Sequence, residues 1–513
     1  MSRIKNFTRN LAAGYFQLAV NVVYSFVSIP LILYYLPKAE FGLWATLIQL
    51  MSYLALVDLG MNSAAARLLV DHKDNRADGG YGSLLKTSFV VSAAQGLIVL
   101  LTVVLAAPAL ASLMKVPAEQ APTFITLMRW QGLLTVTGFC LRPLGMMLYA
   151  HQREYVVTLT GTLSLVVSLV LLWLGLAGGH GIYSFIYAGV LGAILTPVCL
   201  YWNCRKFDLL PRSGEWGKAS RKIFCEVFAY GKDVFLMNLG AQLQMASQTI
   251  VVSRCFGLEM AAVWAVGTKM FNLLLPLMTR PLGAAFPGFY EMWVRGEMER
   301  LKSRFREVVL LTACLGAFLS VSFALCNSLF VHVWTSGQIA WSPLNDVLLA
   351  IWLFTLSMQT THCCFVNVTK QIGGMHYILF AEGCCFVVLA TVFGYRWGIA
   401  GMVSVSIVCT LAFSYAYSLI RSVSCFRCGF FELAVDWVRP AFKLTLFFGI
   451  IGIFVWFVSR SLPVQVRLAL HSLVAFAVGG ILFVRWGIPP EFMRKVCAAL
   501  PRPVGKLLQA IAC

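Results

Sequence analysis

The chain of 513 residues is too apolar and too poor in charge to be a soluble protein. Hydrophobic residues make up 59% of it and charged residues only 12%, whereas soluble domains carry about a quarter charged residues. The formal net charge of +19 fits the Lys- and Arg-rich cytoplasmic loops of a membrane protein, so no nucleic-acid partner is expected.

Apolar segments long enough to cross a bilayer, about 20 residues each, recur along the whole chain. The first six lie at 12–36, 41–66, 87–111, 123–150, 155–177 and 182–203, and a polar stretch at 204–222 follows them. The next six lie at 228–256, 259–290, 308–331, 346–369, 376–395 and 399–420. Two more, at 440–460 and 464–486, precede a basic tail at 487–513. The sequence therefore predicts an all-α, polytopic integral membrane protein of about 14 transmembrane helices.

The positive charges are divided unequally between the two sides of the predicted membrane. Loops on the side of the N-terminus contain most of the Lys and Arg residues, whereas the opposite loops contain only Lys38, Lys115, Arg254, Arg396, Arg460 and Arg467. Because cytoplasmic loops are enriched in these residues, both termini are predicted to be cytoplasmic. The outward loops are all short and leave no place for an external catalytic loop, so the chain is not expected to be an enzyme.

A weak internal repeat divides the predicted helices into two groups. Gly42-Leu43-Trp44-Ala45 aligns with Ala262-Val263-Trp264-Ala265 at an offset of 220 residues (262 minus 42). A repeat of six spans keeps its orientation, so two six-helix lobes with a cavity between them are predicted. The expected organisation is an N-terminal lobe at 1–203, a cytoplasmic linker at 204–222, a C-terminal lobe at 223–421, two additional transmembrane helices at 422–486 and a basic cytoplasmic tail at 487–513.

Polar residues inside the spans are the first candidates for a binding site. Gln17 and Asn21 share a helical face in the first span, and Asn238 and Gln242 share one in the seventh. Such residues commonly form hydrogen bonds between membrane helices. Because the two stripes are equivalent under the repeat, a shared water-filled lumen that binds the substrate is the better interpretation.

Embedded charges are the stronger candidates, since a central Arg or Lys costs about 2.5–3.5 kcal/mol on insertion scales. Lys269 and Arg280 lie 11 residues apart (280 minus 269) on one face of the eighth span, with a rise between them of about 16 Å. Arg142 begins the tetrapeptide Arg142-Pro143-Leu144-Gly145, which recurs at Arg280, and its proline favours a kink. Lumen-facing cations would bind an anion; the alternative is that they snorkel to the interface.

Asp58 in the second span is the candidate for coupling transport to an ion. It would take up a proton or a sodium ion, or it would pair with a buried cation. The 16 cysteines lie mostly inside apolar segments, and Cys425 and Cys428 have no second pair of ligands. Neither a metal site nor a cofactor is therefore expected.

The segment Asn21–Val70 has a recognisable pattern. It reads N-V-V-Y-S-F-V-S-I-P, then F-G-L-W, then D-L-G before a run of small residues and Arg67. This segment resembles the opening of the polysaccharide-biosynthesis (O-antigen type) flippases, in the multidrug/oligosaccharidyl-lipid/polysaccharide exporter superfamily. Residues Gln244–Gly257 resemble the opening of the second half of these proteins. Many relatives have an acidic residue where this chain has Gln248, so no ion coupling is implied at that position.

The resemblance implies a flippase that moves a polyprenyl-pyrophosphate-linked oligosaccharide from the cytoplasmic to the outer leaflet of the cell (inner) membrane by alternating access. Lumen cations in this superfamily hold the pyrophosphate or acidic sugars. The partners expected are the lipid-linked oligosaccharide, membrane lipids and glycan-assembly enzymes.

Two other functions remain open. A multidrug exporter of the same fold would favour cationic drugs in a carboxylate-rich cavity, whereas the embedded charges here are mostly positive. A membrane enzyme that polymerises or ligates lipid-linked glycans would need the external loop that this chain lacks.

Overall fold

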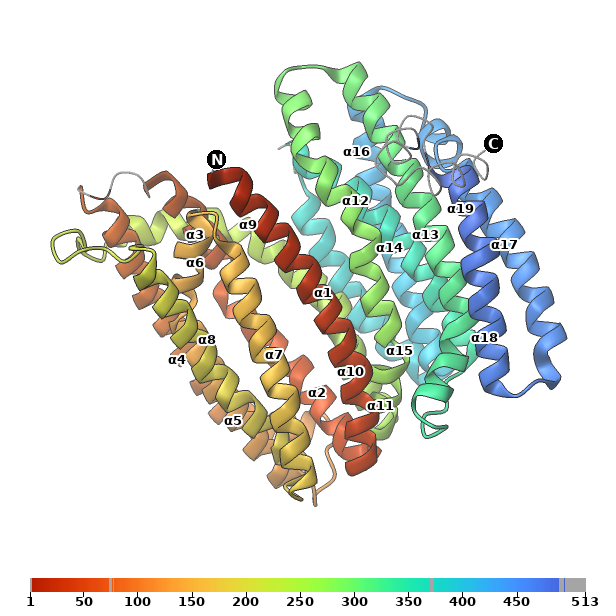
Figure 1. The fold of residues 1–513 in the computed structure, drawn as a ribbon, viewed down its shortest axis with the longest axis horizontal. Coiled ribbons are helices and arrows are strands. Elements are labelled where there is room, and N and C mark those ends of the chain that lie inside the picture. The colour runs from red at the N-terminus through yellow and green to blue at the C-terminus, as the bar shows by residue number, and fades with distance from the viewer. Residues whose placement is uncertain (1, 73–75, 77, 370–372, 489–492, 494–513) are drawn as a thin grey trace. The chain divides into compact units, whose positions relative to one another are not determined.

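The computed structural model describes residues 2–72, 76, 78–369, 373–488 and 493, and every regular element in these ranges is helical (Figure 1). This confirms the predicted all-α, polytopic fold. The chain forms two compact units, Met1–Ala262 and Val263–Cys513. Nearly all of the predicted basic tail at 487–513 lies outside the described residues.

The first unit consists of helices whose apolar sequences alternate with Gly, Pro and charged turns. Its helices are α1 (Ser2–Tyr35), α2 (Lys38–Leu54), α3 (Met61–His72), α4 (Gly80–Leu113), α5 (Ala121–Cys140), α6 (Arg142–Ala150), α7 (Glu154–Ala177), α8 (Ser184–Lys206), α9 (Arg221–Met245) and α10 (Ser247–Phe256). α11 (Leu258–Gly267) contains the boundary between the units. α4 packs along α5, α7 along α8, and α1 along α7. Tyr81, Leu85 and Met147 are among the fully buried residues that hold α3, α4, α6 and α8 together.

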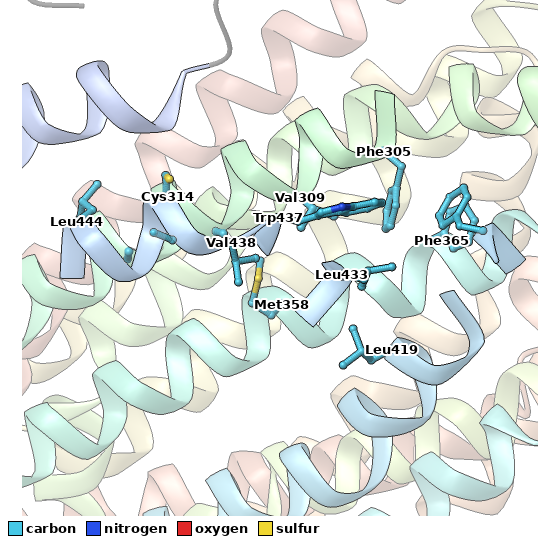
Figure 2. Packing of buried hydrophobic residues seen from close by; sticks show 14 of the residues in the cluster. Phe305, Val309, Cys314, Met358, Phe365, Leu419, Leu433, Trp437, Val438 and Leu444 are labelled. Carbon is cyan, nitrogen blue, oxygen red and sulfur yellow. The ribbon is translucent and has the colours of Figure 1, made fainter. Parts of the chain in front are cut away.

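The second unit continues with α12 (Lys269–Val294), α13 (Met298–Trp334), α14 (Pro343–Val368), α15 (Met375–Thr410), α16 (Ala416–Phe426), α17 (Arg439–Val458), α18 (Val464–Val474) and α19 (Gly480–Gly487). Its core contains a group of aromatic rings, part of which is shown in Figure 2. The ring of Phe305 from α13 lies 4.5 Å from that of Phe365 on α14 and 6.2 Å from that of Trp437, measured between centroids. Aromatic pairs at these distances add to the stabilisation from burial.

The predicted count of spans agrees with the helices. Within the described residues, 12 helical segments are long and apolar enough to cross a membrane. One of these, Met375–Phe426, covers the two spans predicted at 376–395 and 399–420. The span predicted at 228–256 corresponds to α9 and α10, which are not among the 12.

α15 is a hairpin of two helices rather than one long helix. Gly398 inside it has φ 66° and ψ −154°, a conformation far from helical. The carboxylate of Glu382 accepts a hydrogen bond of 3.1 Å from the backbone N–H of Ser414, although 32 residues of straight helix would extend about 48 Å. Glu382 and Ser414 are equally far from Gly398 along the chain, so the chain reverses at that glycine.

The last two predicted helices, α17 and α18–α19, pack against α13. His471 in α18 fastens them through two hydrogen bonds. Its Nδ1 donates to the carbonyl of Leu325 on α13 at 2.9 Å, and its Nε2 pairs with the hydroxyl of Ser459 at 3.0 Å. Because a carbonyl can only accept, the proton must be on Nδ1.

α9 and α10 pack with the helices of the first unit, α9 against α3 and α10 against α2. The repeat assigns both helices to the C-terminal lobe. The division into lobes on either side of 204–222 stays a prediction.

Candidate substrate-binding site

The helix is interrupted between α5 and α6, and this interruption positions Arg142. Leu141, with φ −107° and ψ 5°, leaves the helical conformation, and α6 starts at Arg142 with Pro143 in its first turn. Proline is tolerated in the first turn because that N–H has no partner in the helix. The kink predicted from Arg142-Pro143 is therefore confirmed. At the second copy of the tetrapeptide, α12 continues through Arg280 and Pro281.

Arg142 forms an ion pair with Asp58. Its Nη1 lies 2.5 Å from Asp58 Oδ1, and its guanidinium lies over the ring of Phe139, 3.6 Å from the centroid. The side chains of Arg142 and Asp58 are 26% and 19% exposed, so one edge of the pair remains accessible. The pairing of Asp58 with an embedded cation, one of the two roles predicted for it, is therefore present in the structure, and its role in ion coupling stays a prediction.

Asp58 is held in place by an unusual turn. It ends a short 3-10 helix, Ala55–Asp58, and the next two residues have positive φ, 52° at Leu59 and 70° at Gly60. The side chain of Gln95 on α4 donates to the carbonyl of Asp58 at 3.1 Å, and Asp58 Oδ2 accepts from the N–H of Asn62 at 3.4 Å. The Asp-Leu-Gly sequence thus ends one helix and fixes the carboxylate that receives Arg142.

A cavity of about 700 Å³ lies beside this pair, within the first unit. Its walls come mainly from α5, α6, α7 and α8, with Asn62 from α3, and include Arg142. Polar side chains line much of it: Asn62, Gln131, Thr135, Thr137, Ser164, Ser168 and Thr196. Gly138 and Gly145 leave open space, since a Cβ added at either would meet no atom within 4 Å. The volume is within the range of ligand pockets, about 300–1,000 Å³.

The cavity suits an anion that carries hydroxyl groups. A guanidinium presents its donors in a planar fork that matches two oxygens of a phosphate. Ser and Thr hydroxyls and the Gln amide both donate and accept, as sugar hydroxyls require. The cavity has one carboxylate in its lining, Glu154. Because Asp58 already neutralises Arg142, an anion that enters must compete with that carboxylate.

Most of the polar residues in this cavity were not selected from the sequence. Their signal is present, because Gln131 and Thr135 lie four residues apart on α5, and Ser164 and Ser168 do so on α7. Residues with this spacing share a helical face. Which helical faces line the same cavity depends on how the helices pack, and the spacing of residues along one helix does not specify that packing.

The polar residues predicted on the first and seventh spans lie in different surroundings. Gln17 on α1 faces α7, since its Nε2 would lie 3.9 Å from a Cβ at Gly161. Asn21 is half-buried on the same helix, and Asn238 is exposed on α9. Gln242 connects α9 to α2, because its Nε2 donates to the hydroxyl of Ser52 at 2.5 Å. This bond is a contact between two helices, and the substrate contact predicted for Gln242 stays a prediction.

Lys269 and Arg280 belong to α12 in the second unit. Lys269 is the first residue of that helix and is half-buried, and it forms no ion pair with any described residue. The side chain of Arg280 lies outside the described part of the chain. The structure thus brings together Arg142 and Asp58 and leaves Lys269 and Arg280 in the other compact unit.

A fully buried carboxylate in the second unit, Asp346, was not identified from the sequence. It is fully buried near the start of α14, and its Oδ1 accepts from the amide of Asn327 at 2.7 Å and from the indole of Trp341 at 2.6 Å. Asn327 also donates to the carbonyl of Gly267 at 3.0 Å. These bonds join α11, α13, α14 and the loop before α14.

Comparison with known proteins identifies related sequences and folds. Residues 35–343 match the family model described as "Polysaccharide biosynthesis protein". The lipid II flippase MurJ in an inward closed conformation is similar in structure, with a TM-score of 0.70 and 12% identity over 92% of this chain and 98% of that one. An inward-facing multidrug resistance MATE family transporter of the MOP superfamily has a TM-score of 0.64 and 15% identity over 80% of this chain and 96% of that one.

A third similar structure is a MOP superfamily transporter from Pyrococcus furiosus, described by the reverse polarity of its binding pocket. Its TM-score is 0.55, with 15% identity over 83% of this chain and 97% of that one. Comparison with curated proteins finds no match. At these identities the solved structures show the fold that the chain shares with them and leave the substrate open.

Proposed function

The chain belongs to the polysaccharide biosynthesis protein family, and on that premise we propose that it flips a polyprenyl-pyrophosphate-linked oligosaccharide from the cytoplasmic to the outer leaflet of the cell (inner) membrane. Its helices form a multi-pass membrane transporter of the MOP-superfamily fold. The two six-helix lobes would alternate between states open to either side, as in transporters built from repeats.

The observation that carries this proposal is the position of Arg142 in the wall of a cavity lined by hydroxyl and amide groups. The pyrophosphate of the substrate would bind to the guanidinium, and the first sugars would bind to the polar lining around Gln131 and Ser164. Export of cationic drugs is less well supported, because a cation in this cavity would lie beside Arg142 with Glu154 as the one carboxylate in the lining.

Asp58 has two roles in this proposal. It neutralises Arg142 while the cavity is empty, which lowers the cost of keeping an embedded guanidinium. It is also the candidate that takes up the coupling ion when the pyrophosphate replaces it at Arg142. We also propose that Lys269 and Arg280 contact an anionic head group. Further substrate contacts are proposed for Gln17, Asn21, Asn238 and Gln242.

The test is to delete the gene and measure which lipid-linked oligosaccharide accumulates on the cytoplasmic face of the membrane. Complementation with the wild-type gene should clear the accumulated lipid, and the Arg142→Gln variant should not. Arg129→Gln is the matched control, because Arg129 is an exposed cation on the same span that does not line the cavity. If no lipid-linked glycan accumulates in the deletion strain, or if it accumulates already on the outer face, the chain does not flip such a substrate.

A further inference from the structure

An apolar groove of about 540 Å³ runs between α13, α14 and α17 in the second unit. Its walls include Val321 and Leu325 from α13, Val347 and Phe354 from α14, and Ile453 from α17. Polar side-chain atoms in its lining come only from Ser320, Thr445 and the indole of Trp456. The hydroxyl of Thr445 donates to Ala441 in its own helix at 2.9 Å. The groove therefore suits a hydrocarbon chain.

The groove is long and opens outward from the protein. Along α17 its lining extends from Phe442 to Phe457, which corresponds to about 22 Å of helix and exceeds half of the hydrocarbon core of about 30 Å. Phe442, Ile453 and Phe457 are 51%, 59% and 56% exposed. In a membrane these side chains are covered by hydrocarbon, and the groove between them would receive a chain that lies along the helices.

A fixed cation marks one end of the groove. The guanidinium of Arg460 lies 3.9 Å from the ring centroid of Trp456 and 4.3 Å from that of Phe457, and both rings line the groove. Arg460 belongs to the turn Ser459–Ser461, which the hydrogen bond between Ser459 and His471 holds in place. Arg460 is exposed and forms no ion pair with any residue that the structure describes.

We propose that this groove is a binding site for an anionic phospholipid, which places one acyl chain between α13, α14 and α17 and its phosphate on Arg460. Charge complementarity supports this occupant. The apolar groove matches an acyl chain, and Arg460, held on two aromatic rings at the end of the groove, matches the phosphate at the end of that chain. Aromatic and basic residues commonly meet lipid head groups at the membrane interface. The site lies wholly in the second unit and is separate from the cavity that contains Arg142.

Gly449 provides a direct test of the chain-binding part. A Cβ added at Gly449 would meet no atom within 4 Å, and Gly449 lines the groove. Gly449→Leu should therefore fill the space without a clash inside the protein. Gly480→Leu is the matched control, because Gly480 also lies in a helix of this unit, also has no atom within 4 Å of an added Cβ, and does not line the groove.

The measurement is native mass spectrometry of the full-length chain in detergent, titrated with phosphatidylglycerol or phosphatidylcholine. The wild type should retain one phosphatidylglycerol per chain about tenfold more strongly than phosphatidylcholine, as a charge-assisted contact predicts. Arg460→Gln should abolish that preference, and Arg396→Gln, which changes another exposed cation, should keep it. Gly449→Leu should lose the retained lipid, and Gly480→Leu should keep it.

The proposal is overturned if Gly449→Leu retains phosphatidylglycerol as the wild type does, if a polyprenyl phosphate displaces phosphatidylglycerol at equal concentration, or if the groove is closed by a second copy of the chain in a lipid-free dimer. If Gly449→Leu fails to fold, Ala324→Leu tests the same groove from α13. A second measurement does not depend on these leucine variants. Phosphatidylglycerol with brominated acyl chains should quench tryptophan fluorescence less in Trp456→Phe than in the wild type. Equal quenching would place the lipid elsewhere.

Discussion

At the scale of single residues, the pair of Arg142 and Asp58 makes a prediction about stability and transport together. Asp58→Asn leaves a partly buried guanidinium without its anion, and Arg142→Gln leaves the carboxylate without its cation. Each should lower the free energy of unfolding by about 2 kcal/mol, between the values for exposed and fully buried pairs. The double variant should recover most of this loss, which thermal unfolding in detergent would measure.

The same three variants separate structure from binding. If Arg142 holds the pyrophosphate, Arg142→Gln and the double variant should both fail to flip substrate, although the double variant is stable. Asp58→Asn should keep substrate binding in detergent, because the cation remains. A double variant that clears the accumulated lipid-linked oligosaccharide at matched expression would show that Arg142 has a structural role alone.

Lys269 makes a second prediction at this scale. It is half-buried at the start of α12 and has no anionic partner among the described residues. Lys269→Ala and Arg280→Ala should each impair flipping while the protein still inserts, and Arg280→Glu should be worse than alanine because it repels a pyrophosphate. Arg300→Ala, which removes an exposed cation paired with Glu297, is the control. Normal glycan export by both alanine variants at matched expression would mean that these cations are structural or snorkel to the interface.

At the scale of the element, Gly398 determines whether α15 forms two helices or one. Its φ of 66° with ψ of −154° belongs to a region that only glycine adopts readily, at a cost to other residues of about 1–3 kcal/mol. Gly398→Ala should therefore lower the midpoint of thermal unfolding. Gly480→Ala, at a helical glycine with open space around it, should raise it slightly or leave it unchanged. Equal effects of the two substitutions would contradict the hairpin.

The sequence predicts the elements better than it predicts how their side chains meet. Hydropathy predicts the spans on either side of Gly398, and the missing N–H of proline predicts the kink at Pro143. Both are local properties of the sequence. Asp58 and Arg142 are 84 residues apart in the chain, so each was identified as an embedded charge without its partner. The polar lining at Gln131 and Ser164 was missed for the same reason, since it depends on how helices pack.

At the scale of the whole molecule, the arrangement of charges predicts the topology. Met1, Gly214, Gly296 and Cys513 should be cytoplasmic, and Ser342 and Ser461 should face outward. The check is to place single cysteines on a cysteine-free background and label intact cells with an impermeant maleimide. Ser342 and Ser461 should react and Gly214 should not. Labelling of Gly214 from outside would reverse the orientation and would move the end of the groove at Arg460 to the cytoplasmic leaflet.

The cavity beside Arg142 has a further consequence for how such proteins diversify. All of its lining residues lie between Asn62 and Leu200, and Asp58 precedes them by only a few positions. One genetic crossover in the stretch 204–222 would thus transfer the complete cavity, with its ion pair, from one relative to another. A lineage that changes its glycan could acquire a matching pocket by inheriting one uninterrupted segment of the gene. The half of the gene that encodes α12 and the groove along α17 would remain that of the original lineage.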